Sequence, residues 1–321
     1  MRTLLEEMLI ALFMGMILPG MILSAAVWIQ EDRQMEQVAS VAAPSEAPLR
    51  SHPILVLNAD GIETEMELES YLVGVVLAEM PASFEREALK AQAVVARTYT
   101  LRTESTGGKH GNGSICTQAS CCQAYIKEDE YLEIGGTEVD LEKVRCAVEE
   151  TAGLVLTYEG QLIEATYFSC SGGQTEDAVA VWGADFPYLR SVESPGEENA
   201  AYFTDTVTFT SAEFQNALGV SLEGKPEHWF GEVVKTVGNG VDTMTIGGEK
   251  YRGTELRAKL GLRSTAFSVF VEGDTISVHT KGYGHRVGMS QYGAEAMAVA
   301  GSTYPQILAH YYQSTELVTM P

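Results

Sequence analysis

The stretch EMPASFEREALKAQAVVARTYTL, residues 79–101, decides the fold of this chain. Pro81 ends an apolar helix predicted for residues 68–78, and Ser83 is placed to cap a second helix that runs to residue 102. Small side chains recur on one face of this second helix, which indicates close packing against another element. The face consists of Leu89, Ala93, Ala96 and Thr100.

Strands and helices alternate irregularly around this pair of helices. The run ILVLN, residues 54–58, predicts a strand before it, and residues 141–153 predict a helix after it. The absence of a regular strand–helix–strand repeat indicates an α+β fold of helices and antiparallel strands. We therefore expect one folded region over residues 53–321, with residues 206–253 as an inserted strand-rich subdomain. Further predicted elements are a hairpin about Glu159-Gly160, a short helix at 254–260, a hairpin at 267–280, and two helices separated by Gly301 and Pro305.

The N-terminal segment decides the compartment. Residues 8–29 carry no charge, and as a helix this run is long enough to cross a hydrocarbon core of roughly 30 Å. A cleaved signal peptide is the alternative, but its apolar part is normally only about 7–15 residues long. We predict a single-pass transmembrane anchor over residues 1–30, a polar tether over 31–52, and the folded part on the extracytoplasmic side of the cell membrane.

The charge of the chain limits its partners. It has 21 Lys and Arg against 44 Asp and Glu, a formal net charge of −23. Such a surface repels nucleic acids and anionic lipid head groups, so we expect no nucleic-acid partner. Acidity that serves solubility alone is the other interpretation.

Glu79 is a candidate general acid because it ends an apolar helix. The C-terminus of a helix carries partial negative charge, and apolar neighbours such as Leu77 and Met80 add desolvation. Both effects raise the pKa of a carboxyl group toward the range in which it can protonate a substrate. The alternative is an ordinary solvated glutamate in the last turn of a helix.

The loop HGNGSICTQASCCQAY, residues 110–125, brings a His and three Cys close together. Imidazole and thiolate are the ligands of tetrahedral Zn²⁺, and His110, Cys116 and Cys122 follow one another at six-residue steps. A disulfide is the competing interpretation outside the cytoplasm, although five cysteines leave at least one unpaired. The isolated Cys146 and Cys170 are expected to be small buried side chains.

Two glycine-rich motifs also carry polar groups. They are SCSGGQTE, residues 169–176, and GYGHRVGMSQYGAEAM, residues 282–297. Glycine allows close backbone approach, so these loops are expected to line a binding cleft with N–H donors. Ser290 is placed to cap a helix that starts at Gln291, and His285 is expected to be structural or to orient substrate. Neither a phosphate-binding loop nor a serine-hydrolase elbow is present.

Five stretches in series resemble the stage II sporulation protein D family, also called the SpoIID/LytB domain, and the resemblance runs from about Pro53 to the C-terminus. They are the opening stretch and the motifs HGNGSICTQASCCQAY, YFSCSGGQTE (167–176), PYLRSVESP (187–195) and GYGHRVGMSQYGA (282–294).

The resemblance implies roles for individual residues. The family's catalytic glutamate falls on Glu79, and its required arginine falls on Arg97, which we expect to support Glu79 from the next helix. Arg190 and Glu197 stand where the family usually has Lys and Asp. The zinc ligands fall on His110, Cys116 and Cys122, and Cys121, water or another group completes a structural Zn²⁺ site. From the glycine-rich motifs we expect substrate-binding or supporting roles for Ser171, His285, Ser290 and Gln291.

The activity implied by the resemblance is that of a peptidoglycan lytic transglycosylase in forespore engulfment. Such an enzyme cleaves the bond between N-acetylmuramic acid and N-acetylglucosamine in denuded glycan strands and leaves 1,6-anhydro ends. The implied partners are glycan strands, a sporulation amidase and a membrane scaffold, and a homodimer is also compatible with the sequence. The alternatives are a non-catalytic wall-binding protein that enhances an amidase and a zinc-dependent hydrolase that uses the Cys/His loop.

Overall fold

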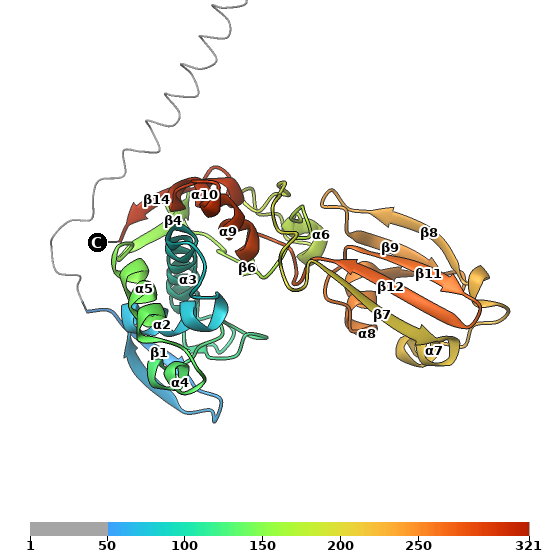
Figure 1. The fold of residues 1–321 in the computed structure, drawn as a ribbon, viewed down its shortest axis with the longest axis horizontal. Coiled ribbons are helices and arrows are strands. Elements are labelled where there is room, and N and C mark those ends of the chain that lie inside the picture. Colours follow the sequence, from blue (N-terminus) through green and yellow to red (C-terminus); the bar gives the residue numbers. More distant parts are fainter. Residues whose placement is uncertain (1–50, 321) are drawn as a thin grey trace, which may run out of the picture. The chain divides into compact units, whose positions relative to one another are not determined.

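The structure, a computed structural model, describes residues 51–320 and mixes helices with mostly antiparallel strands, which confirms the predicted α+β class (Figure 1). Within this part of the chain the buried apolar side chains form two cores. The first core draws on residues 54–189 and 287–312, and the second on residues 214–278. The second core therefore lies in a segment inserted between two parts of the first.

The predicted anchor, residues 1–30, and most of the predicted tether, residues 31–52, lie outside the described residues. Within residues 51–320, none of the helices combines the length and the apolar character that a membrane span requires.

Helix α3 (Arg86–Thr106) is the element around which the first core is built. Its predicted small-residue face is buried, with Leu89, Ala93 and Ala96 fully inaccessible to solvent and Thr100 2% exposed. Small side chains allow neighbouring elements to approach α3 closely. These neighbours are α2 (Leu68–Glu79), α5 (Glu138–Glu149), α9 (Gln291–Val299), α10 (Tyr304–Tyr311) and β4 (Leu154–Tyr158).

The start of α3 corrects one prediction. Glu85, not Ser83, occupies the N-cap position, and no side chain caps the helix there. The chain first makes a turn in which the backbone N–H of Phe84 donates to the carbonyl of Pro81 at 3.0 Å. This turn buries the ring of Phe84 and keeps Ser83 ahead of the helix.

Two small sheets complete the first core. In one, β1 (Pro53–Leu57) pairs antiparallel with β2 (Glu63–Glu67) and parallel with β3 (Ile115–Cys116). In the other, β4 lies between β14 (Glu316–Thr319) and β5 (Gln161–Leu162). The β4–β5 pair is the predicted hairpin about Glu159-Gly160, although its second arm is only two residues long. The remaining helices near this core are α4 (Glu128–Glu133) and α6 (Ala178–Trp182).

The second core lies between two three-stranded sheets with the strand orders β10-β9-β8 and β11-β12-β7. Because β7 pairs with β12, and β12 with β11, the predicted boundary at residue 253 cuts through this unit. The sheet needs the hairpin at 267–281 to cover its buried face. The elements are β7 (Thr204–Thr210), α7 (Ser211–Leu218), η1 (Pro226–His228), β8 (Phe230–Lys235), β9 (Val241–Ile246), β10 (Glu249–Arg252), α8 (Gly253–Lys259), β11 (Phe267–Glu272) and β12 (Thr275–Lys281).

The two glycine-rich motifs lie side by side. Strand β6 (Tyr167–Phe168) pairs in parallel with β13 (Met289–Ser290), and Cys170 forms a bridge with Tyr283. Gly288 makes this approach possible, since its φ is +81° and a Cβ there would stand 2.1 Å from the carbonyl oxygen of Thr166. Segments more than a hundred residues apart in the sequence are thereby joined next to the end of α2.

Candidate functional site

Glu79 is the last residue of α2 and its carboxyl group is partly buried. The backbone N–H of Ala124 donates to its Oε1 at 2.6 Å. Burial raises the pKa of Glu79, while the hydrogen bonds from Ala124 and from Tyr167 and the amide of Gln291 oppose the rise. No second carboxyl group among the described residues takes part in this shift. The site therefore offers one carboxyl group with a raised pKa, the property expected of a general acid.

A buried polar network stands behind Glu79. The hydroxyl of Tyr167 donates to Oε1 of Gln123 at 3.2 Å, and Nε2 of Gln123 donates to Oγ1 of Thr100 at 3.0 Å. Thr100 belongs to α3, so the network ties the carboxyl group to the central helix. The sequence analysis missed Tyr167 and Gln123 as functional residues, although both lie inside the motifs that it quoted.

The motif at 282–297 supplies Gln291 to the same site. Ser290 caps α9 as predicted, because its Oγ accepts the backbone N–H of Gly293 at 3.2 Å. The cap fixes the first turn of the helix, where Gln291 is 6% exposed. Among residues 51–320, Nε2 of Gln291 has no hydrogen-bond partner of ordinary geometry. This donor next to Glu79 is therefore free to bind a substrate oxygen.

His285 is held by aromatic neighbours, with ring centroids 5.2 Å from Trp182 and 5.6 Å from Phe168. Burial, helped by the positive charge of Arg257, lowers its pKa to about 4. The imidazole is therefore neutral near pH 7, and its Nδ1 accepts the backbone N–H of Val287 at 3.2 Å. These contacts agree with the predicted structural role.

The expectation that Arg97 supports Glu79 directly is wrong. Arg97 is fully buried, and its guanidinium group makes two bonds to the carboxylate of Glu69, at 2.8 and 2.6 Å. It also donates to the carbonyls of Leu154 and Val148, both at 3.2 Å. Glu69 and Glu79 are at opposite ends of α2, roughly 15 Å apart at a rise of about 1.5 Å per residue. Arg97 thus anchors the start of α2 to the first core.

Glu197 and Ser171 also have internal rather than substrate-facing contacts. The carboxylate of Glu197 is 1% exposed and accepts Oγ and the backbone N–H of Ser171, at 2.8 and 2.7 Å. It further accepts the N–H of Gly172 at 3.1 Å and Oγ of Ser194 at 2.5 Å. The N–H groups expected to line a cleft are therefore satisfied within the protein, and Glu197 holds the SCSGG loop in shape.

Two arginines complete the description of this region. Arg190 forms a surface ion pair with Asp185 at 2.7 Å. Arg286, which the sequence analysis did not single out, is 1% exposed and has a φ of 66°. It donates to the carbonyls of Ser171 and Gln174, at 2.7 and 2.6 Å, and so locks the two glycine-rich motifs together. Its position within the second motif was the available signal.

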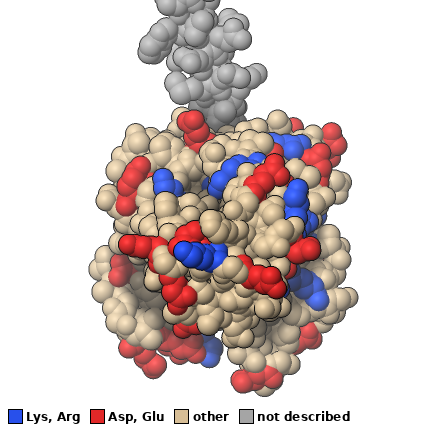
Figure 2. Space-filling view, turned by 90° about the vertical axis from the view of Figure 1, so that its right-hand side faces the viewer, with Lys and Arg blue, Asp and Glu red and all other residues tan. Residues whose placement is uncertain are grey.

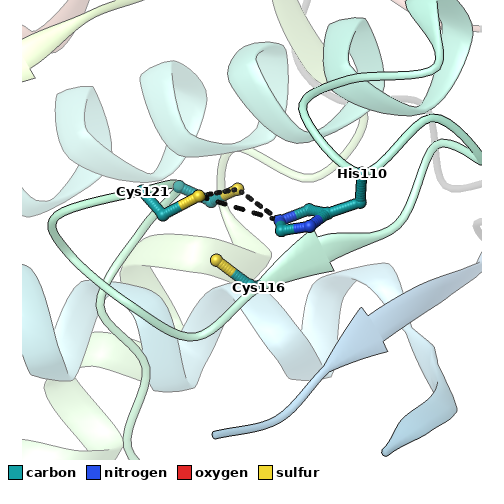
Figure 3. A group of neighbouring side chains, drawn as sticks. His110, Cys116 and Cys121 are labelled. Carbon is teal, nitrogen blue, oxygen red and sulfur yellow. Dashed lines mark hydrogen bonds between the residues drawn. The ribbon is translucent and has the colours of Figure 1, made fainter. Parts of the chain in front are cut away.

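The predicted metal ligands are brought together. One ligand atom each from His110, Cys116, Cys121 and Cys122 lies within 4.8 Å of the others. In Figure 3 the imidazole of His110 and the sulfurs of Cys116 and Cys121 point toward a common centre. No disulfide joins the cysteines of the described region.

The distances in this cluster fit a tetrahedral ion. With Zn–S of about 2.3 Å and Zn–N of about 2.0–2.1 Å, a regular tetrahedron has S–S edges of about 3.8 Å and S–N edges of about 3.6 Å. The sulfurs of Cys121 and Cys122 are 3.9 Å apart, and they lie 3.8 and 3.6 Å from Nε2 of His110. Hydrogen bonds that include His110 lower the pKa of Cys116 to about 7 despite its burial, which eases thiolate formation. The four residues therefore fit Zn²⁺, with Cys121 as the fourth ligand.

The two remaining cysteines differ from each other. Cys170 is buried as predicted, and its thiol donates to Oε2 of Glu197 at 3.1 Å. Burial raises the pKa of this thiol to about 12, which keeps it protonated. Cys146 is only partly buried on α5, contrary to the expectation, because it lies on the helix face that Glu142 shares.

Comparisons with known proteins agree with these motifs. Residues 60–158 match the family described as SpoIID, stage II sporulation protein. The chain is 44% identical over 284 residues to Stage II sporulation protein D of Bacillus subtilis strain 168, covering 86% of this chain and 82% of that protein. It is 40% identical over 277 residues to the protein of the same name from Bacillus amyloliquefaciens, covering 85% and 79%. It is also 29% identical over 307 residues to the Amidase enhancer of Bacillus subtilis strain 168, covering 77% of this chain and 40% of that protein. The chain therefore belongs to the stage II sporulation protein D family.

Proposed function

We propose that this protein is a lytic transglycosylase that cleaves the bond between N-acetylmuramic acid and N-acetylglucosamine in peptidoglycan glycan strands. The observation that carries the proposal is the carboxyl group of Glu79, partly buried and with a raised pKa. The proposed setting is forespore engulfment, in line with the sporulation name of the relatives. A membrane anchor at residues 1–30 and an extracytoplasmic catalytic region belong to the same proposal.

One carboxyl group is sufficient for this reaction. Glu79 first donates its proton to the glycosidic oxygen as that bond breaks. The resulting carboxylate then accepts the proton of the muramoyl 6-hydroxyl as its oxygen attacks the anomeric carbon, and a 1,6-anhydro end forms. Glycosidases that use water normally need two carboxyl groups at about 5–5.5 or 6.5–9.5 Å. The attacking hydroxyl here belongs to the substrate, so no second carboxyl group is required.

The neighbours of Glu79 set its orientation. Ala124 holds Oε1 through its backbone N–H, so the other carboxyl oxygen, Oε2, is the one we assign to the substrate. Tyr167 and Gln291 stabilise the carboxylate that remains after proton transfer, since both lower the pKa. This balance lets the same group act as an acid and then as a base.

We assign Zn²⁺ a structural role. When bound, the ion would cross-link the loop between α3 and α4 through His110, Cys116, Cys121 and Cys122. Four protein ligands close a tetrahedral site and leave no position for a reactive water, which argues against the zinc-dependent hydrolase.

The second candidate function is a non-catalytic wall-binding protein that enhances an amidase. The 29% identity to a protein named Amidase enhancer favours this candidate. In both cases glycan strands are the binding partner, and an amidase and a membrane scaffold are the proposed protein partners.

The test is Glu79→Gln, assayed by mass spectrometry on amidase-treated glycan. The variant keeps an oxygen for the N–H of Ala124 but has no transferable proton, so we expect no 1,6-anhydro ends above background. Glu295→Gln is the matched control, because burial also raises the pKa of Glu295 and its carboxylate also accepts one backbone N–H at 2.6 Å. It should retain the activity of the parent.

Two outcomes would reject the proposal. Equal digestion by the parent and by Glu79→Gln would show that another group acts as the acid. A parent protein that sediments with sacculi, releases no fragments and stimulates an amidase equally with and without Glu79 would establish the second candidate.

A further inference from the structure

A pocket of about 650 Å³ lies at the surface of the second core, away from the residues discussed so far. This volume is within the range of about 300–1,000 Å³ that is typical of small-molecule sites. Its polar lining comes from Asp205 on β7, Arg257 on α8, Arg263 after that helix, and Tyr283 of the second glycine-rich motif.

Arg263 is held between two tyrosine rings at the edge of this pocket. Its guanidinium carbon lies 3.9 Å from the ring centroid of Tyr202 and 4.8 Å from that of Tyr283. The two rings also contact each other edge to face at 5.3 Å. Tyr202 and Tyr283 are 43% and 37% exposed, so each keeps ring surface open to solvent. The cluster therefore presents aromatic surface and a fixed positive charge together.

The positive charge in the pocket is incompletely balanced. Nε of Arg263 lies 3.3 Å from Oδ2 of Asp205, yet it makes no hydrogen bond within the described residues. Arg257 donates to the carbonyl of Leu262 at 3.3 Å, and no carboxylate of residues 51–320 contributes to its pKa, which burial lowers. Two guanidinium groups thus share one carboxylate in a chain of net charge −23. An anion in the pocket would supply the missing partner.

The shape and charge of the surroundings restrict this anion. Acidic side chains are spread among basic and uncharged ones on the face shown in Figure 2, and the net charge disfavours an extended polyanion. The planar guanidinium fork suits a carboxylate, and the exposed tyrosine rings suit the apolar face of a sugar. A single acidic sugar unit meets both conditions.

The pocket is connected to the Glu79 site through the second glycine-rich motif. Tyr283 lines the pocket, and Gln291 of the same motif lies by Glu79. Between them, His285 experiences the charge of Arg257 and interacts with the backbone of Tyr167, whose hydroxyl bonds to Glu79. A polymer bound at Glu79 has a continuous path of contacts to the pocket.

We propose that the pocket formed by Asp205, Arg257, Arg263 and Tyr283, flanked by Tyr202, binds a carboxylate-bearing sugar unit of the glycan strand. The inference rests on the proposed function for the identity of the polymer. N-acetylmuramic acid carries such a carboxylate on its lactyl group when no peptide is attached. The arginines pair with that carboxylate, and a tyrosine ring packs on the sugar.

The experiment measures binding to the full chain carrying Glu79→Gln, which separates recognition from cleavage. Ligand-observed NMR titrations compare N-acetylmuramic acid, its lactyl carboxamide and N-acetylglucosamine. We expect the acid to bind at least about tenfold more tightly than the carboxamide, because only the acid pairs with the guanidinium groups. Arg257→Gln should remove this preference. Arg252→Gln, an exposed arginine of the same unit, should keep it.

Melting curves verify the fold of each variant, and Tyr202→Ala provides a second test if Arg257→Gln is unfolded. That change should weaken binding of the acid and of the carboxamide alike, because it removes ring surface rather than charge. Equal binding of acid and carboxamide, or an unchanged preference in Arg257→Gln, would overturn the pocket assignment. Failure of the cleavage proposal is recognised separately, as digestion by Glu79→Gln with the acid preference intact.

Discussion

The backbone N–H of Ala124 donates a 2.6 Å hydrogen bond to Oε1 of Glu79, and Ala124 stands two residues after the metal-ligand candidate Cys122. The loop that carries the His and Cys cluster therefore also positions the proposed catalytic carboxyl group. Gln123, between them, contacts Thr100 on α3 and Tyr167 on β6. Order in the metal loop and order at Glu79 are thus coupled.

Removal of zinc should lower both stability and activity. A chelator strong enough to extract Zn²⁺, or the change Cys116→Ser, should lower the melting temperature by several degrees, because the loop loses its cross-link. Glycan cleavage should fall as the N–H of Ala124 loses its position. Elemental analysis should give about one zinc per chain. Cys146→Ser, outside the cluster, is the control and should change neither quantity. Zinc-free protein with an unchanged melting curve would contradict the assignment.

The raised pKa of Glu79 predicts opposite effects of its replacement on activity and stability. Burial raises the pKa above that of the unfolded chain, so the group's contribution to stability is present below the unfolded pKa and is lost as pH rises through the folded pKa. Glu79→Gln should therefore be at least as stable as the parent near pH 7 and less stable relative to it near pH 4. Urea unfolding at the two pH values measures this difference. A stability gap independent of pH would argue against the raised pKa.

The same shift predicts the pH dependence of cleavage. The protonated form of Glu79 is needed for the first step, so kcat/KM should fall as pH rises above the raised pKa. Glu295→Gln should show the same profile as the parent, since that carboxyl group is outside the site. A profile that stays flat up to pH 9 would contradict general acid catalysis by Glu79.

Replacement of Arg97 should reduce stability rather than act on the reaction itself. Arg97→Met leaves Glu69 and the carbonyls of Leu154 and Val148 without their partner and should cost about 3 kcal/mol of unfolding free energy. Arg102→Met is the matched control, because its ion pair with Glu164 is about 30% exposed on both sides and should contribute about 1 kcal/mol or less. Urea unfolding compares the two variants. Full stability with lost activity in Arg97→Met would restore the direct role that the sequence suggested.

Glu197→Gln should loosen the SCSGG loop. The carboxylate accepts four hydrogen bonds from Ser171, Gly172 and Ser194, and an amide would turn one donor toward those donors. We expect a loss of about 2–3 kcal/mol. Glu193→Gln, at an exposed neighbour, should change stability by less than about 0.5 kcal/mol. Thermal unfolding measures both, and equal effects would contradict the structural role of Glu197.

Gly74→Ala tests how closely α2 packs on the loop before α4. A Cβ at Gly74 would stand 2.3 Å from Cε2 of Tyr125 and 2.5 Å from the carbonyl oxygen of Ile126. Because a backbone atom is among the obstacles, we expect a loss of about 1–3 kcal/mol. Cleavage should also fall, since Tyr125 follows Ala124. Ala78→Ser, at an exposed position of the same helix, is the control. A stabilised Gly74→Ala variant would show that helix propensity outweighs the clash.

Local patterns were sufficient for several features of this protein. The helix at residues 68–79, the buried small-residue face of α3 and the cap at Ser290 follow from spacing and capping chemistry within a few residues. The His and Cys cluster was also predictable, because all four ligands belong to one short loop. Glu79 was a candidate from its place at the end of an apolar helix.

Partner choice required the tertiary structure. The sequence by itself determined which elements form, which family the chain resembles and which side chains can bind metal. Only the tertiary structure decided that Arg97 pairs with Glu69, that Glu197 binds the SCSGG loop, and that Tyr167 and the N–H of Ala124 meet Glu79. The physical reason is that a buried charge or donor must find a partner among whatever groups the packed core brings near it. Those groups come from segments far apart in the chain, and no local spacing records their approach.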